Sequence, residues 1–280
     1  MISAFKRRLQ RSAKRRKQVK HLRSVSTRSC DTTNLENWFG GELENIFHDQ
    51  DLDKEWERVA NQLARICDIQ DGQTVGVNPG DRRALYYLVQ RFRPSSVLEI
   101  GTHVGASTCH MVAAMTEGSV VTVDRSDVND PLEGYWKKSG LRLSPRQMME
   151  RLGCQAAVSF VKSDSIDVLE NPGRCFDLIF LDGDHSAATV YKEIPLALKA
   201  LAKRGLIILH DYFPKNKPLW SNGSCVHGPH LAVKRLQSEG APIRVFPLGA
   251  LPWPTKQGSN VTSLAVLAGS SRSGSEGPER

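Results

Sequence analysis

The feature that most constrains the fold is a short apolar run ending in two glycines four residues apart. Residues 97–108 read Val-Leu-Glu-Ile-Gly-Thr-His-Val-Gly-Ala-Ser-Thr, and a helical pattern follows to about Met115. The run before Gly101 is typical of a strand buried on both faces. A strand, a glycine turn and a helix N-terminus together form an anion site, because the first amides of the helix have no partner within it. A turn without a ligand is the alternative.

The side chains of this turn distinguish two kinds of ligand. A dinucleotide fingerprint needs a second glycine two residues after the first, and His103 stands there instead. Glu99 adds a carboxylate, which repels phosphate and suits a cationic ligand. S-adenosylmethionine (SAM) carries a carboxylate, an ammonium and a sulfonium but no phosphate, so it suits this turn better. We therefore predict cofactor contacts from Glu99, Gly101, Thr102, Gly105 and Ser107.

Two further predicted strands also end near acids. Residues 119–124 end in Asp124, about 20 residues after the glycines, where an acid can accept hydrogen bonds from both ribose hydroxyls. Residues 158–165 end in Asp164 and Ser165, which we expect to meet the adenine edge. The sequence therefore predicts a complete adenosyl site from three consecutive strand ends.

In this order, the motifs resemble those of the class I SAM-dependent methyltransferases, from about Pro79 to Gly269. The resemblance implies a doubly wound, Rossmann-like α/β sheet of seven strands, mostly parallel, with one antiparallel strand near the C-terminus. The residue pattern agrees, because strands alternating with helices indicate a parallel sheet. The last two strands, at 243–248 and 263–268, have no helix between them, which predicts the antiparallel member.

Acidic residues also end the fourth and fifth strands. Residues 176–182 end in Asp182, and residues 205–211 end in His210 and Asp211. Neighbouring parallel strands bring their carboxyl ends to one crevice, where two acids are suited to a divalent cation. The segments Leu-Asp-Gly-Asp-His and His-Asp-Tyr resemble those of metal-assisted small-molecule O-methyltransferases. The resemblance implies a Mg²⁺ or Mn²⁺ site made by Asp182, His210 and Asp211.

One departure bears on this metal site. His210 stands where that subgroup usually has a carboxylate or carboxamide, and imidazole shifts the preference from Mg²⁺ toward Mn²⁺, Fe²⁺ or Zn²⁺. The alternative is that Asp182 and Asp211 cap loops without an ion. For catalysis we predict His185 as the base that removes the acceptor proton, with Asp182 beside it and also in contact with the cofactor. The alternative for His185 is a solvent-bonded histidine at a helix start.

The positive charge of the chain is concentrated at its start. The formal net charge is +8, but residues 1–30 hold 11 Lys and Arg and no acid, which leaves 27 basic against 30 acidic side chains elsewhere. We predict a basic disordered arm over residues 1–33. Contact of residues 1–30 with nucleic acid or an anionic membrane, or an organelle presequence, are the alternatives.

The rest of the chain divides into three parts. We predict a helical N-terminal preface at 34–78, the SAM-binding domain at 79–269 and a disordered tail at 270–280. The preface helices could cover the cofactor or form a homo-oligomer contact. Six cysteines without a CxxC pair, and no apolar run of membrane-spanning length, predict a reduced cytoplasmic protein.

These features favour one function over two others. The predicted protein is a SAM-dependent O-methyltransferase acting on a hydroxyl of a small molecule, such as a sugar, a phenol or a similar natural product. The first alternative is a nucleic-acid-associated methyltransferase that uses the basic arm. The second is a SAM-binding partner subunit without turnover.

Overall fold

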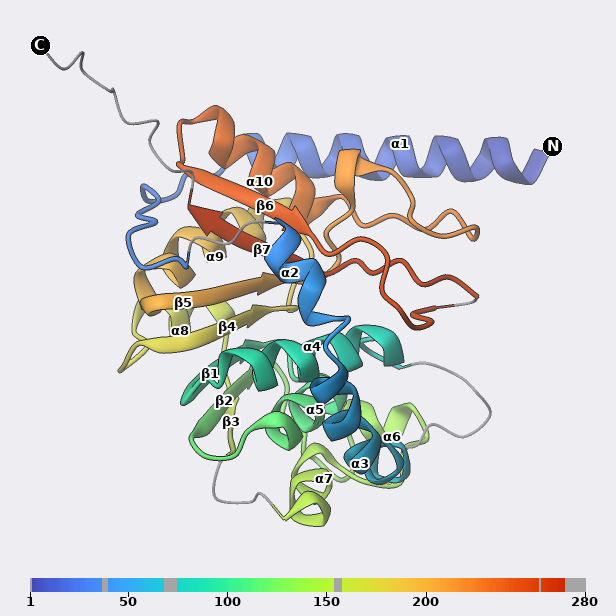
Figure 1. Ribbon diagram of the computed structural model, residues 1–280. Helices are drawn as coiled ribbons and strands as arrows, with labels where there is room; N and C mark the ends of the chain where they lie inside the picture. The colour runs from blue at the N-terminus through green and yellow to red at the C-terminus, as the bar shows by residue number, and fades with distance from the viewer. Residues whose placement is uncertain (1, 37–39, 68–74, 154–157, 257, 270–280) are drawn as a thin grey trace, which may run out of the picture.

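A seven-stranded sheet in the order β3-β2-β1-β4-β5-β7-β6 forms the centre of the molecule (Figure 1). The computed structural model describes residues 2–36, 40–67, 75–153, 158–256 and 258–269. β7 runs antiparallel to both β5 and β6, and the other described pairs are parallel. The prediction of a mostly parallel sheet with one antiparallel strand is confirmed. The strands are β1 (Ser96–Ile100), β2 (Ser119–Asp124), β3 (Val158–Lys162), β4 (Phe176–Leu181), β5 (Leu201–Leu209), β6 (Ile243–Pro247) and β7 (Ala265–Gly269).

Helices cover both faces of the sheet, as a doubly wound fold requires. One layer contains α3, α4, α5 and α7, and the other contains α1, α8, α9 and α10. The central strands read as apolar runs because both of their faces lie against these layers. The helices are α1 (Ile2–Arg23), α2 (Gly40–Ile46), α3 (Gln50–Ile66), α4 (Pro79–Phe92), α5 (Ala106–Ala114), α6 (Tyr135–Lys138), α7 (Pro145–Leu152), α8 (Ser165–Glu170), α9 (Ala187–Ala200) and α10 (Gly228–Ser238).

The N-terminal segment differs from its prediction. Residues 2–23 form the helix α1, which lies along α10 and packs on α9, instead of a disordered arm (Figure 1). Leu22 is buried, and its carbonyl oxygen accepts a hydrogen bond from the Arg235 guanidinium. Arg11 Nη1 donates to the carbonyl oxygen of Gly223 over 2.9 Å. These contacts with residues 200 positions away stabilise a helix whose own sequence has no strong apolar face.

Two helices, α2 and α3, lie within the described part of the predicted preface at 34–78. In α3, Asp49 caps the first turn by accepting hydrogen bonds from the amides of Asp51 and Leu52, and Leu63 and Ile66 are buried. The predicted disordered tail at 270–280 lies outside the described residues. Within the described ranges, no helix is both long enough and apolar enough to cross a membrane.

Candidate functional site

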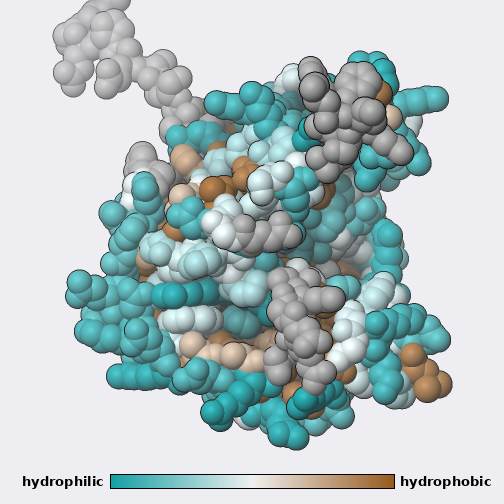
Figure 2. Space-filling view, turned by 90° about the vertical axis from the view of Figure 1, so that its right-hand side faces the viewer, coloured by the Kyte–Doolittle hydropathy of each residue, from teal (hydrophilic) through white to brown (hydrophobic). Residues whose placement is uncertain are grey.

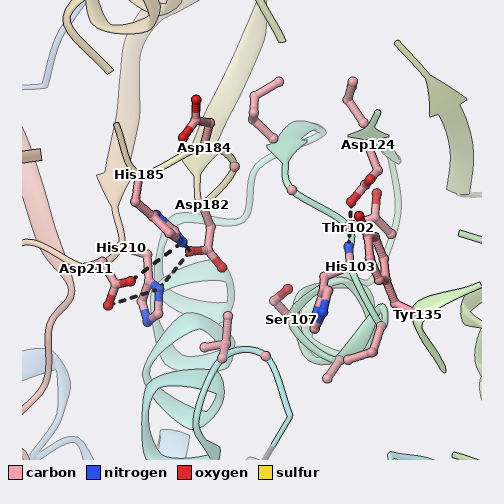
Figure 3. Close-up of a pocket in the computed structure, with 18 of the residues that line it drawn as sticks. Thr102, His103, Ser107, Asp124, Tyr135, Asp182, Asp184, His185, His210 and Asp211 are labelled. Carbon is pink, nitrogen blue, oxygen red and sulfur yellow. Dashed lines mark hydrogen bonds and ion pairs between the residues drawn. The ribbon is translucent and has the colours of Figure 1, made fainter. Parts of the chain in front are cut away.

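A cavity of about 570 Å³ lies at the carboxyl ends of the parallel strands, within the size range of small-molecule sites. Figure 2 views the molecule from this side and shows a largely hydrophilic face. Figure 3 shows Thr102, His103 and Asp124 on one side of the cavity and Asp182, His185 and His210 on the other. The cavity therefore has two halves, one over β1 and β2 and one over β4 and β5.

The glycine turn forms the floor of the first half. Gly101 has φ +102°, and a Cβ atom there would overlap the carbonyl oxygen of Asp182 on the neighbouring strand. Gly105 has φ +76° and begins α5 without a side-chain cap, so its first amides are not capped by the chain. Thr102 and Ser107 line the cavity, as predicted, whereas Gly105 itself does not.

Glu99 lies beneath this floor and does not line the cavity, although the sequence predicts a cofactor contact. It is fully buried and accepts hydrogen bonds from three hydroxyls, those of Ser107 (2.6 Å), Thr122 (2.6 Å) and Thr108. Burial raises its pKa to about 7, against the lowering effect of these hydrogen bonds. Glu99 therefore joins β1, β2 and α5, and it positions the Ser107 hydroxyl at the cavity wall.

The second and third strand ends complete the first half. Asp124 lines the cavity, and its Oδ2 accepts a hydrogen bond from the backbone amide of His103 over 3.0 Å. Ser163 and Ser165 line it as well. Asp164 does not, because its carboxylate caps α8 and pairs with Arg125 at 2.9 Å. The position of Asp164 therefore does not support its predicted contact with the cofactor. The position of Ser165 is consistent with its predicted contact.

In the second half, His210 joins two carboxylates. Its Nδ1 lies 2.7 Å from Asp182 Oδ1, and its Nε2 lies 3.2 Å from Asp81 Oδ2. Burial lowers the pKa of His210, but the charges of Asp182 and Asp211 outweigh burial and hold the pKa well above its usual value. Both ring nitrogens face carboxylate oxygens, an arrangement that favours the protonated ring.

This geometry does not suit the predicted metal site of Asp182, His210 and Asp211. An imidazole binds a metal through a neutral nitrogen with a free lone pair, and both nitrogens of His210 already lie within hydrogen-bonding distance of carboxylate oxygens. In the described part of the chain, no group of three or more His, Cys, Asp or Glu side chains is arranged to hold an ion. The local signature around Asp182 and Asp211 could not show this, because Asp81 lies 129 positions away from His210.

His185 lies at the mouth of the same half. Its Nε2 is 3.6 Å from Asp211 Oδ2 and 3.9 Å from Asp182 Oδ1, and its side chain is 39% exposed. Asp211 adopts φ +51° at the end of β5, which turns the chain toward the cavity. The predicted base and the two predicted acids therefore lie together. A histidine oriented by carboxylates and open to a ligand is suited to take a proton.

Several cavity residues have no signal in the local sequence. Asn78 lines the cavity, and its Nδ2 donates to Asp81 over 2.6 Å. Tyr135, at the start of α6, also lines the cavity, and its ring lies 4.8 Å from that of His103. Trp220 and Lys256 line the second half from segments distant in the sequence. Only the sheet topology brings these four residues together.

Residues 98–212 match a family model described as a methyltransferase domain, Methyltransf_24. This segment contains the glycine turn, Asp124 and both acid-bearing strand ends. Together with the sheet order, the match gives the class that this segment resembles: residues 98–212 are similar to the methyltransferase domain that the model describes. Among individual proteins, the chain is similar to a catechol O-methyltransferase from Niastella koreensis, with 27% identity over 142 residues. That match covers 49% of this chain and 58% of the relative, so the chain spans somewhat more than half of the relative's length.

Solved structures share the fold. One is a candidate O-methyltransferase from Klebsiella pneumoniae, with a TM-score of 0.51 and 19% identity over 77% of this chain and 89% of that one. Another is the cofactor-bound Rv0187 from MTB, with a TM-score of 0.51 and 19% identity over 76% and 90% of the two chains. At this level of identity the similarity concerns the fold alone.

Proposed function

We propose that the protein is a SAM-dependent O-methyltransferase of a small hydroxylated acceptor. The observation that carries the proposal is the two-part cavity, with an adenosyl-type half and a half that holds a histidine between acids. The named activity of the Niastella koreensis relative supports the same reaction. SAM supplies an activated methyl group, and the chain's own residues have to bind and align the two reactants.

The residues of the first half are suited to SAM. The uncapped N-terminus of α5 offers amides to a carboxylate, and Asp124 offers acceptors for ribose hydroxyls. His103 occupies the place where a dinucleotide would need glycine. In the second half, His185 takes the proton of the acceptor hydroxyl, and Asp211 stabilises the imidazolium that results. His210 holds Asp182 in place at the boundary between the halves.

Calorimetry with S-adenosylhomocysteine (SAH), followed by turnover of catechol with labelled SAM, tests this proposal. We expect SAH to bind, Asp124→Ala to weaken binding by about tenfold, and His185→Ala to lower kcat by about 100-fold or more with SAH affinity retained. Absence of SAH binding would reject the cofactor. Unchanged turnover of His185→Ala would reject the base.

A chelator decides whether a metal takes part. Because both nitrogens of His210 lie against carboxylate oxygens, we expect turnover to stay within twofold after treatment with EDTA. Loss of turnover that Mn²⁺ restores would instead show that His210 releases a proton and binds an ion, as the local signature implies.

A second candidate concerns α1. Its exposed side chains include Lys14, Arg15 and Arg16, without any acid nearby in the helix, which supports contact with an anionic polymer such as nucleic acid. A salt-dependent gel shift that Lys14→Gln and Arg15→Gln weaken together would favour this candidate.

The cytoplasm remains our expected compartment. A homo-oligomer through α2 and α3 remains a prediction that light scattering can test.

A further inference from the structure

Among the residues that the structure describes, Lys256 is a basic side chain of the cavity without a carboxylate partner. Arg125 pairs with Asp164 at 2.9 Å, His185 lies 3.6 Å from Asp211, and His210 lies 2.7 Å from Asp182. Lys256 also lines the cavity and is half-buried, but within the described residues it forms no ion pair. A half-buried ammonium group without a counter-charge favours an anion in the space beside it.

Lys256 lies in the acceptor half. It lines the cavity together with Trp220, Ser263 and Asp211, which come from the β5 and β7 side of the sheet. The residues suited to the adenosyl group, Asp124 and Ser165, lie at the other end of the strand order. An anion bound by Lys256 therefore belongs to the acceptor and not to the cofactor.

The wall beside Lys256 is aromatic. Its Nζ lies 5.0 Å from the centroid of the Trp220 ring, in a cation–π arrangement. Phe213 packs edge-on against Trp220 at 5.4 Å, and Trp220 Nε1 donates to the carbonyl oxygen of Val261 over 3.1 Å. Trp220 is therefore buried and fixed on two sides, and the part of it that lines the cavity forms a rigid apolar wall.

The loop that carries Lys256 is fixed as well. Thr255 Oγ1 donates to the carbonyl oxygens of Ser259 (3.0 Å) and Val261 (2.7 Å), and Thr255 is buried. Trp253 Nε1 donates to the carbonyl oxygen of Gly80 at the start of α4, over 3.0 Å. Val261 accepts from both Thr255 and Trp220, so one carbonyl joins the segments that carry the lysine and the aromatic wall. The pair is thus positioned before any ligand arrives.

We propose that the acceptor is a hydroxylated aromatic acid, whose carboxylate pairs with Lys256 while its ring lies against Trp220 and its hydroxyl faces His185. This inference rests on the proposed function. It adds a charge requirement that neither the reaction nor the base imposes, because deprotonation of a hydroxyl by His185 would serve a neutral phenol equally well. Lys256 is therefore a specificity residue and not a catalytic one.

The test compares 3,4-dihydroxybenzoate with catechol as acceptors for the full chain and labelled SAM. We expect wild-type kcat/KM to be about tenfold higher for the acid, which corresponds to about 1.4 kcal/mol. Lys256→Gln should raise KM for the acid by about tenfold, leave kcat within twofold, and leave catechol turnover unchanged. Lys256→Arg should recover most of the lost affinity. The control is Lys217→Gln, which removes an exposed lysine from the segment that contains Trp220. It should change the turnover of neither acceptor.

The outcomes separate this inference from the proposed function. Equal wild-type kcat/KM for both acceptors, or an equal loss for both in Lys256→Gln, overturns the charge requirement and leaves O-methylation standing. Turnover of catechol without turnover of 3,4-dihydroxybenzoate also overturns the charge requirement and leaves O-methylation standing. Turnover of neither acceptor overturns the aromatic-acid inference, and SAH calorimetry with a wider panel of hydroxyl acceptors then decides the proposed function separately.

Discussion

At the scale of single residues, His210 supplies positive charge to an acidic site. It lies between Asp81 and Asp182, and each of its nitrogens meets one carboxylate. The local sequence correctly predicts that His210 lies at the crevice, because His210 directly follows the apolar run that forms the end of β5. Its bonding partner Asp81 lies in the first turn of α4 and cannot be identified from spacing. Local pattern therefore predicts which residues reach the site but not which of them pair.

Glu99 gives a prediction about pH. Its pKa is about 7 in the folded protein and 4.5 for an ordinary glutamate, so the folded state retains a proton that the unfolded state has lost between these values. The free energy of unfolding should therefore fall as the pH rises from about 4.5 to about 7, by up to about 3 kcal/mol from this residue. Glu99→Gln should remove that part of the slope in urea titrations at several pH values. Glu117→Gln, at an exposed glutamate, is the control, and equal slopes in the two variants would contradict the assignment.

A substitution at Gly101 tests the close approach of its Cα atom to the backbone of Asp182. Gly101→Ala combines a positive φ with overlap on the Asp182 carbonyl, whereas Gly140→Ala has φ +72° and nothing within 4 Å. Both variants should lose about 1 kcal/mol from backbone strain. Only Gly101→Ala should also weaken SAH binding, by tenfold or more, because the Asp182 strand end has to move. Equal SAH affinity in both variants would show that the turn tolerates a side chain.

At the scale of elements, the strands follow from the sequence more closely than the N-terminal helix does. The central strands β1 and β4 are apolar runs bounded by turn residues, so burial fixes them locally. Helix α1 has no comparable signal, because a charge-rich segment with few apolar residues is typical of disorder. Its contacts with α9 and α10 come from residues that the local pattern does not link to it.

Gln18 tests how α1 is attached to the domain. Its Oε1 accepts a hydrogen bond from the amide of Ala187, the first residue of α9, over 2.7 Å. Gln18→Leu leaves that amide without its partner and should lower the free energy of unfolding by about 1 kcal/mol. Lys17→Leu, at the neighbouring exposed position, should have little effect in the same chemical denaturation experiment. A matching loss in both variants would mean that the loss does not come from this hydrogen bond.

At the scale of the whole molecule, the cavity depends on strand order and not on chain order. It collects residues from Gly76 to Ser263, so a ligand there contacts most of the sheet. SAH at 100 times its Kd should stabilise the fold by about 2.7 kcal/mol and raise Tm by several degrees in thermal denaturation. NAD should not, because His103 stands in place of the glycine that a pyrophosphate needs. Equal stabilisation by NAD would show that a turn with His103 at this position does not exclude a pyrophosphate.

The docking of α1 has a consequence for synthesis on the ribosome. Synthesis runs from the N-terminus, so α1 is made before its supports α9 and α10, which end at Ala200 and Ser238. At roughly 5–20 residues per second, α1 waits on the order of 10–40 s before both supports exist. During that interval its basic side chains have no folded partner, and they are exposed to ribosomal RNA and to chaperones. Helix α1 therefore leaves the ribosome before the helices that support it and reaches its final position only after them.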